Sequence, residues 1–250
     1  MSIFNEFFKK EKPVFTGLKF GFGSGGGGGG AAAASVVATG GAVQDYTDGS
    51  TTYRVHIFSN SVADFVYTSG PGLIDVMVLG GGGSGSGTTG DQDAGKGGGG
   101  SGGLAWASQI PVSPGTTCPV TVGAGGRGHY GADPGSTRVG RNGSDSQFVI
   151  PSGPHTIIGR GGGGGGVADS VPSPVSATRV PATDTNNGMD GGSGGGSGAR
   201  GSGNSQFNGG STTQAAANPS MPWVTDYGND GGDSESNPSG SGGGGGGIGG

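Results

Sequence analysis

Long runs of glycine constrain this chain more than any other feature of its sequence. Six consecutive glycines occupy 161–166, and glycine makes up 68 of the 250 residues. Further glycine-rich tracts lie at 80–87, 97–103, 191–203 and 242–247. Glycine loses more conformational entropy on folding than any other residue, disfavours helices and gives a strand no side chain to pack. Something other than the burial of large side chains must therefore stabilise the fold.

One backbone conformation makes use of the absent side chain. In polyproline-II geometry three residues complete a turn and no hydrogen bonds form within the segment, so glycine segments can pack closely and hydrogen-bond sideways. Glycine recurs every third residue at Gly192, Gly195, Gly198 and Gly201, which keeps one face of that segment bare. We therefore expect a mainly β protein in which short strands accompany a packed polyglycine-II-type bundle. Solvated linkers between small β-units are the alternative.

Several short runs have the composition of β-strands. Tyr53, Val55 and Ile57 alternate with polar residues, a period of two that is typical of a strand. Four more runs are rich in residues that fit a half-buried strand: 73–79, 104–112, 117–122 and 147–150. The turn residues Ser113-Pro114-Gly115 predict that the second and third of these form a hairpin.

The first 22 residues differ chemically from the rest of the chain, because they hold most of its phenylalanine and lysine. Ile3, Phe4, Phe7 and Phe8 share one face of a short predicted N-terminal helix, which Pro13 ends. So short a helix is marginal in water on its own. We expect the segment, with Phe15, to dock on another protein. Packing against its own domain and lying at a membrane interface are the alternatives.

Composition divides the chain into four parts. Residues 1–22 form the docking segment, 23–35 a Gly/Ala linker, 36–166 a β and glycine-rich domain, and 167–250 a glycine-rich C-terminal part with exposed loops. The last part is acidic, and a solvated acidic face is the expected state of its carboxylates. These are Asp226, Asp230, Asp233 and Glu235.

Charge and cysteine content argue against several function classes. The net charge is −5 and no basic stripe is present, so we expect no nucleic-acid binding. No run approaches the roughly 20 apolar residues of a membrane-spanning helix, so no membrane insertion is expected. Cys118 is the lone cysteine and cannot form a disulfide within the chain.

The motifs that resemble catalytic or cofactor sites lack a residue or a structural context that the chemistry requires. Residues 90–97 approach a P-loop but lack its final Ser or Thr, and Asp91 and Asp93 would repel phosphate. The GxSxG patterns at 99–103 and 191–195 lie inside glycine tracts, without the strand–helix context of a nucleophile elbow. Three histidines stand without a second ligand nearby: His56, His129 and His155. We expect no catalytic residues, no cofactor and no metal.

Aromatic residues beside polar groups are the best candidates for recognition. Tyr130, Trp223 and Tyr227 carry rings that can stack on sugars or anchor a protein contact. They fall in two of the three segments that we expect to be loops, 127–146 and 218–238; the third is 167–190.

Two parts of the sequence resemble phage virion proteins. SIFNEFFKKEKPVFTGLKFGFG, at 2–23, resembles short N-terminal segments that attach virion proteins of phages of marine bacteria to the particle. VMVLGGGGSGSG, GGGGSGG and PVSPGTTCPVTVGAGG, between 76 and 126, resemble glycine-rich domains of tail-fibre and tail-tip proteins, and are similar in style to polyglycine-sandwich adhesins.

That resemblance implies a tail-fibre or tail-tip protein of the virion, assembled in the host cytoplasm. It would be attached to other virion proteins through residues 1–22 and would face a host-surface receptor through Tyr130, Trp223 and Tyr227. A decoration or cement protein and an ice-binding polyglycine protein are the alternatives, and a homo-oligomer is left open.

Overall fold

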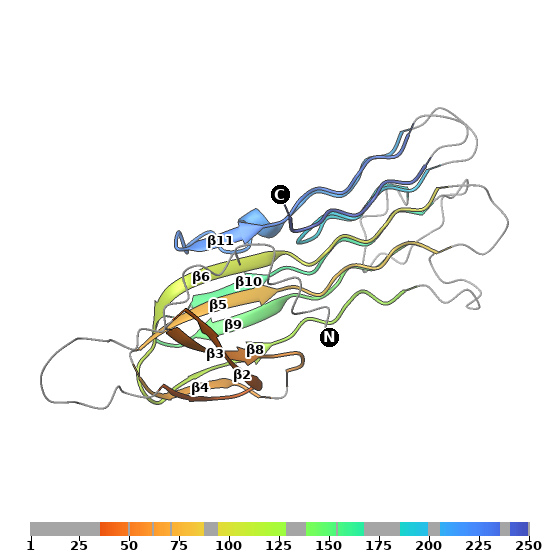
Figure 1. The fold of residues 1–250 in the computed structure, drawn as a ribbon. Coiled ribbons are helices and arrows are strands. Elements are labelled where there is room, and N and C mark those ends of the chain that lie inside the picture. The colour runs from red at the N-terminus through yellow and green to blue at the C-terminus, as the bar shows by residue number, and fades with distance from the viewer. Residues whose placement is uncertain are drawn as a thin grey trace, which may run out of the picture.

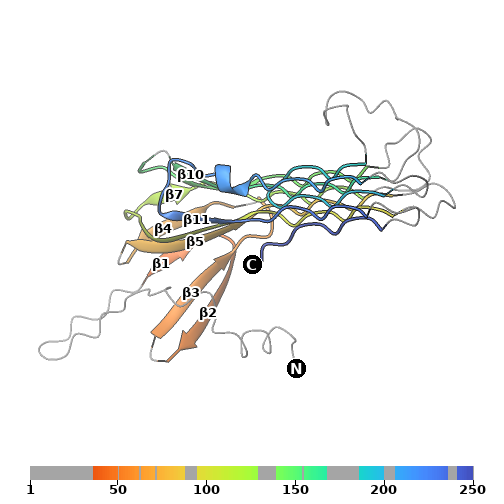
Figure 2. The same cartoon turned by 90° about the horizontal axis from the view of Figure 1, so that it is seen from above.

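The computed structural model describes residues 36–49, 51–61, 63–70, 72–87, 95–128, 139–153, 155–167, 186–199, 206–235 and 241–249. Within these ranges the molecule is elongated. Small β-sheets lie at one end, and glycine-rich segments run side by side from them to the other end (Figures 1 and 2). The predicted N-terminal helix and the linker at 23–35 lie outside the described residues.

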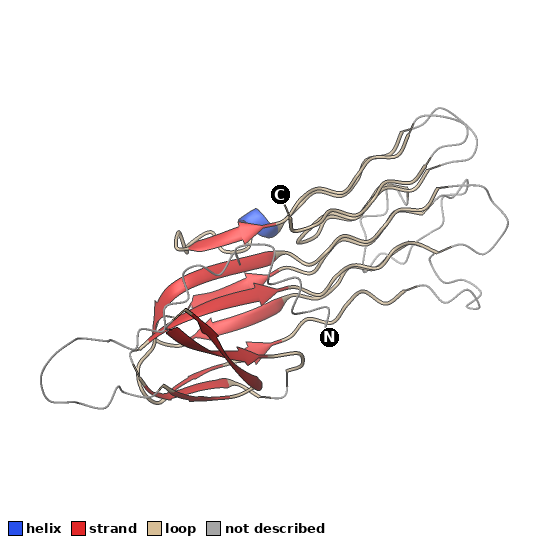
Figure 3. Ribbon diagram, viewed as in Figure 1, coloured by secondary structure: helices blue, strands red, loops and turns tan. Residues whose placement is uncertain are grey.

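The mainly β class is confirmed, because strands dominate the regular structure of the described residues (Figure 3). The strands are β1 (Val37–Thr39), β2 (Ala42–Asp48), β3 (Thr51–Ile57), β4 (Phe65–Ser69), β5 (Leu73–Leu79), β6 (Leu104–Pro111), β7 (Thr116–Cys118), β8 (Val120–Thr121), β9 (Ser146–Ile150), β10 (His155–Gly159) and β11 (Val224–Tyr227). One turn of 3₁₀ helix, η1 (Gln214–Ala216), precedes β11.

The strands form four small antiparallel sheets. Their strand orders are β1-β4-β7, β10-β9-β8, β11-β6-β5 and β2-β3. The hairpin β2-β3 projects from the other sheets (Figure 2). Across this hairpin the guanidinium of Arg54 donates two hydrogen bonds of 2.8 Å to the Asp45 carboxylate, which lowers the pKa of Asp45.

The three larger sheets enclose one apolar core. In β5, Ile74, Val76 and Val78 point inward while Leu73, Met77 and Leu79 are exposed, as a period of two requires. Strand β10 contacts β5 and β6, and β9 contacts β5 and β7. The buried cluster comprises Phe65, Tyr67, Ile74, Val76, Val78, Ala105, Ala107, Ile110, Val112, Cys118, Phe148, Ile150, Ile157 and Met221.

The predicted hairpin between 104–112 and 117–122 is wrong. Strand β6 pairs with β5 and β11, whereas β7 pairs with β4 and β8 pairs with β9. The N–H of Gly115, at φ +85°, donates to the Tyr67 carbonyl at 2.8 Å, which directs the chain to β4 instead of back along β6. Pro119 has no N–H, and the ladder is interrupted there between β7 and β8.

Glycine-rich segments continue directly from the strands and form a bundle. Five of the described segments run away from the sheets and five run back, as the direction of the hydrogen-bonded pairs establishes. The outward segments are 80–87, 122–128, 160–167, 193–199 and 228–235. The returning segments are 95–103, 139–145, 186–191, 206–212 and 241–249. The boundary expected between residues 166 and 167 therefore falls inside one hydrogen-bonded bundle.

Candidate functional site

The structure separates the residues suggested for receptor binding. Trp223 lies just before β11, at the end of the sheet away from the bundle, and Tyr227 ends the same strand. Both side chains are exposed, at 38% and 39%. Tyr130 lies outside the described residues, and so do the candidate virion-docking residues Ile3, Phe4, Phe7, Phe8 and Phe15.

The three expected loops are also divided by the structure. Residues 139–146, 186–190 and 228–235 belong to bundle segments or to the start of β9. Polar residues and glycine, which usually mark loops, here belong to segments that are hydrogen-bonded along their length.

Successive N–H groups of the central tract 161–166 point to different neighbouring segments, and the pattern repeats every three residues. Residues three apart donate to the same neighbouring segment, at N···O distances between 2.8 and 3.0 Å. The acceptors of Gly161 to Gly166 are, in order, Asp145 Oδ1, Gly81 O, Ser193 O, Asn142 Oδ1, Ser84 O and Gly196 O. The carbonyls of the tract accept with the same period, in order from Gly192, Gly143, Gly100, Met189, Gly140 and Gly97. All twelve polar backbone groups of this buried tract are thus paired.

Close packing in the bundle requires glycine at positions such as Gly163. A Cβ on Gly163 would overlap the Met189 carbonyl oxygen and would lie 2.6 Å from the nitrogen of Gly195. These obstacles are backbone atoms, so no side-chain rearrangement can relieve them. The absent side chain is therefore a packing requirement here, and not a source of flexibility.

Asparagine and aspartate side chains accept hydrogen bonds from those backbone N–H groups of the bundle that have no backbone carbonyl as their acceptor. Three Asx pairs, each three residues apart, accept backbone N–H groups from residues that are themselves three apart. The bonds, 2.6 to 2.9 Å long, run to Asn142 from Gly164, to Asp145 from Gly161, to Asn187 from Asn208, to Asp190 from Ser211, to Asp230 from Thr212, and to Asp233 from Gly209. We call these six residues the Asx ladder.

Two residues of the expected acidic face belong to the Asx ladder. Asp230 and Asp233 are exposed, yet each carboxylate accepts a hydrogen bond from the backbone of the neighbouring segment. Their sequence, Asp-Gly-Gly-Asp, follows the pattern Asn/Asp-Gly-x-Asp, which also occurs at 142–145 and 187–190. That repeat is the signal from which the ladder could have been predicted.

Buried amide side chains join the bundle to the sheets. Gln214 is fully buried, and its Oε1 accepts from the Arg160 N–H at 2.8 Å while its Nε2 donates to Ile158 O and Asp226 Oδ1. Asn218 likewise donates to the same Asp226 oxygen, at 2.7 Å. Asp226, also expected to be solvated, thus ties η1 and β10 to β11 at the point where the glycine segments begin.

The bundle collects its connections at one end. Each outward segment is followed by a returning one, and both ends of every link lie at the end of the bundle far from the sheets (Figure 1). The links are 88–94, 129–138, 168–185, 200–205 and 236–240, all outside the described residues. Five separate stretches of sequence therefore start and finish together, on a hydrogen-bonded support.

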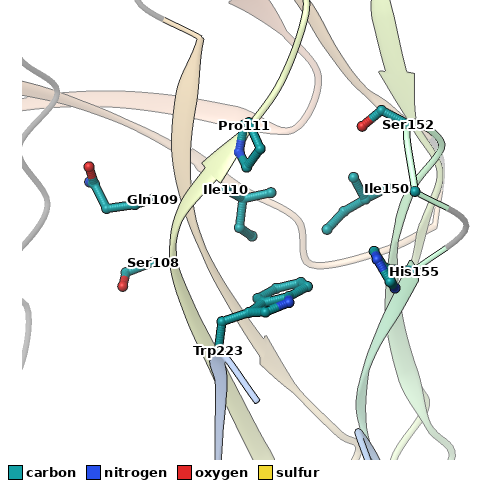
Figure 4. A pocket seen from close by; sticks show the side chains of 9 residues that line it. Ser108, Gln109, Ile110, Pro111, Ile150, Ser152, His155 and Trp223 are labelled. Carbon is teal, nitrogen blue, oxygen red and sulfur yellow. The ribbon is translucent and has the colours of Figure 1, made fainter. Parts of the chain in front are cut away.

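A hollow beside Trp223 lies at the opposite end of the molecule. It has a volume of about 420 Å³ and is lined by Ser108, Gln109, Ile110, Pro111, Ile150, Ser152, Gly153, His155 and Trp223. Trp223, Ile110, Ile150 and His155 converge on it, whereas Ser108 and Gln109 point away from it (Figure 4). The indole of Trp223 meets the His155 ring at 78° with a centroid distance of 5.8 Å.

Other chemistry has little support among the described residues. Cys118 is fully buried, and burial, together with Asp64, raises the pKa of its thiol to about 11, which keeps it protonated and unreactive at neutral pH. No cluster of three or more metal-ligating His, Cys, Asp or Glu side chains occurs in the part of the chain that is described. Nor do the described residues include a helix that is long and apolar enough to cross a membrane.

Comparison with known proteins places the chain in a family. The model of a family described as a glycine-rich domain matches residues 59–250, which include β4 to β11 and the whole bundle. No curated protein and no solved structure matches significantly. The chain belongs to the glycine-rich domain family.

Proposed function

We propose that this chain is a non-enzymatic structural protein of a phage virion, a tail-fibre or tail-tip component that presents its connecting segments to the host surface. The observation that carries the proposal is the gathering of five connections at one end of the bundle. Recognition residues concentrate on loops that a rigid scaffold holds in place. The resemblance of residues 2–23 and of the glycine-rich body to phage proteins supplies the virion context.

We further propose that the bundle segments adopt polyglycine-II geometry. The three-residue rotation of hydrogen bonds around 161–166 supports this, because polyproline-II has three residues per turn. Such segments project successive N–H groups toward different neighbours, so one segment can bond to several others. A scaffold of this kind remains stiff without a large apolar core.

Attachment is assigned to residues 1–22. Burial of Phe4, Phe7 and Phe8 on another virion protein would contribute roughly 1.5–3 kcal/mol for each ring. Deletion of residues 2–22 should leave the rest of the chain folded, with an unchanged melting temperature, but absent from purified particles. Normal incorporation of the deleted form would refute this mode of attachment.

The receptor-binding role is tested by replacing the segments that connect outward and returning bundle segments. Residues 129–138 and 168–185 are replaced by Gly/Ser segments of equal length, and 236–240 is replaced in the same way as a shorter matched control. We expect the long exchanges to abolish adsorption of particles to host cells while melting temperature and copy number stay unchanged. Normal adsorption by intact particles would contradict a receptor-binding role.

A decoration or cement protein is the second candidate, and an apolar outer face favours it. Met77, Leu79 and Tyr227 on the β11-β6-β5 sheet are exposed at 51%, 48% and 39%. Contiguous apolar surface of this kind is often an interaction site. Replacement of Met77 and Leu79 by Ser should weaken particles without affecting adsorption if this candidate is correct. Lost adsorption by stable particles favours the receptor-binding function instead.

A further inference from the structure

We propose that the hollow beside Trp223 binds a neutral sugar ring. This site goes beyond the proposed function, because it lies at the sheet end, far from the grouped connections. A pyranose has a face of C–H groups and an edge of hydroxyls, so its site combines an aromatic ring with hydrogen-bonding groups. The hollow supplies both, and its volume of about 420 Å³ lies within the range of small-molecule sites.

The aromatic part is Trp223. Its side chain is 38% exposed although it borders the apolar side chains of Ile110 and Ile150. The His155 ring is nearly perpendicular to the indole of Trp223, at 78°, so the two rings are not stacked face to face. An exposed indole at the edge of an apolar hollow offers a surface for the C–H face of a sugar.

The polar part is made of side chains with no hydrogen bond in the described structure. The hydroxyl of Ser152 and the ring nitrogens of His155 lie beside the hollow without a described hydrogen-bond partner. The nine lining residues include no Asp, Glu, Lys or Arg. A lining of apolar and hydrogen-bonding side chains without a carboxylate, ammonium or guanidinium group suits the hydroxyls of an uncharged sugar better than an acidic sugar or a phosphate. An aromatic peptide side chain would leave these groups unused.

The wall of the hollow is shaped by a β-bulge. Ile74 faces Ile110 and Val76 faces Ala107, so Ser108 and Gln109 together oppose Asp75 alone. Gln109 has φ +58°, a conformation rare for a residue with a side chain, and its N–H donates to Asp75 Oδ1 at 2.7 Å. Bulges that redirect a strand and residues in unusual conformations both concentrate at functional sites. This bulge lies at the rim where β6 passes the hollow.

The test uses the full chain and a panel of defined sugars. Lactose, maltose, cellobiose, mannobiose and chitobiose are the neutral probes, sialyllactose is the acidic probe, and a synthetic peptide of residues 1–22 is the peptide probe. Each sugar is titrated to about 50 mM and its binding is followed by saturation-transfer NMR. At that sugar concentration, a complex with a millimolar Kd is saturated. We expect at least one neutral sugar to bind saturably and the acidic sugar and the peptide to bind more weakly.

Variants then assign the site. Trp223→Ala should weaken binding by at least about tenfold, a change of about 1.4 kcal/mol, while Trp223→Phe retains most of it. Tyr227→Ala is the matched control, since it removes an equally exposed ring at the other end of β11, outside the hollow. Ser152→Ala, which removes one hydroxyl at the surface, should weaken binding severalfold without altering the melting temperature.

Three results would overturn the proposal. These are no saturable binding by any neutral sugar, equal binding by Trp223→Ala and Tyr227→Ala, and preferred binding of the peptide or the acidic sugar. None of them bears on the connection exchanges above, so the two ideas fail independently.

Discussion

Replacement of Gly163 by alanine is the sharpest perturbation of the bundle. The added Cβ would overlap the Met189 carbonyl oxygen, so the two segments must separate. Separation weakens the hydrogen bond that joins these two segments, in which the Met189 N–H donates to Gly164 O at 2.9 Å, and leaves both buried groups without a partner. Overpacking costs about 1–3 kcal/mol, and each buried polar group left unpaired costs about 1–3 kcal/mol.

We therefore expect Gly163→Ala to lower the free energy of unfolding by at least about 3 kcal/mol. For a chain of this size, that corresponds to a fall of about 6–12 °C in melting temperature. Differential scanning calorimetry and urea unfolding measure both quantities. Gly82→Ala is the matched control, because its Cβ would lie 3.8 Å from the nearest atom, Gly100 O.

The control should change stability by no more than about 1 kcal/mol, with a slight gain expected because alanine restricts the unfolded chain. Equal effects of the two substitutions would refute the reasoning. The tract would then behave as a solvated linker, in which any small side chain is tolerated.

Two further predictions concern single side chains. Asp145→Ala should cost about 1–3 kcal/mol in urea unfolding because Gly161 loses its acceptor, whereas Asp145→Asn keeps an oxygen there and should cost clearly less; equal losses would contradict the role of the Asx ladder. For Cys118, the folded pKa of about 11 lies above the ordinary value of 9.0, so its stabilising contribution is complete below pH 9 and is lost as the pH rises through 11. The full contribution is about 2–3 kcal/mol, and Cys118→Ala should remove this part of the alkaline destabilisation; an identical alkaline profile would contradict it.

The strands were predictable because their side chains carry the information. The period of two at Tyr53, Val55 and Ile57 and the apolar run 73–79 correspond to β3 and β5. Their pairing was less predictable, since Pro114-Gly115 is compatible with a hairpin and also with the change of sheet that occurs. Local turn chemistry does not specify which distant strand supplies the partner.

The bundle illustrates a different limit. Composition predicted that the glycine tracts need lateral hydrogen bonds, but six identical residues at 161–166 contain no register information. Register is fixed by residues in neighbouring segments, notably Asn142 and Asp145, which reach Gly164 and Gly161. The hollow beside Trp223 was not predictable as a whole, because its lining comes from β6, β9, β10 and the turn before β11, which are far apart in the sequence.

Amide hydrogen exchange at residues 161–166 tests the central claim most directly, since every N–H of this tract has an acceptor on a neighbouring segment. Selective ¹⁵N-glycine labelling with NMR detection would report these amides, with Gly128 as an internal reference, because a Cβ there would meet nothing within 4 Å. We predict that the six amides exchange only by cooperative unfolding, at least about a thousandfold more slowly than an unstructured chain. Exchange of the tract at the rate of an unstructured chain would contradict the hydrogen-bonded bundle.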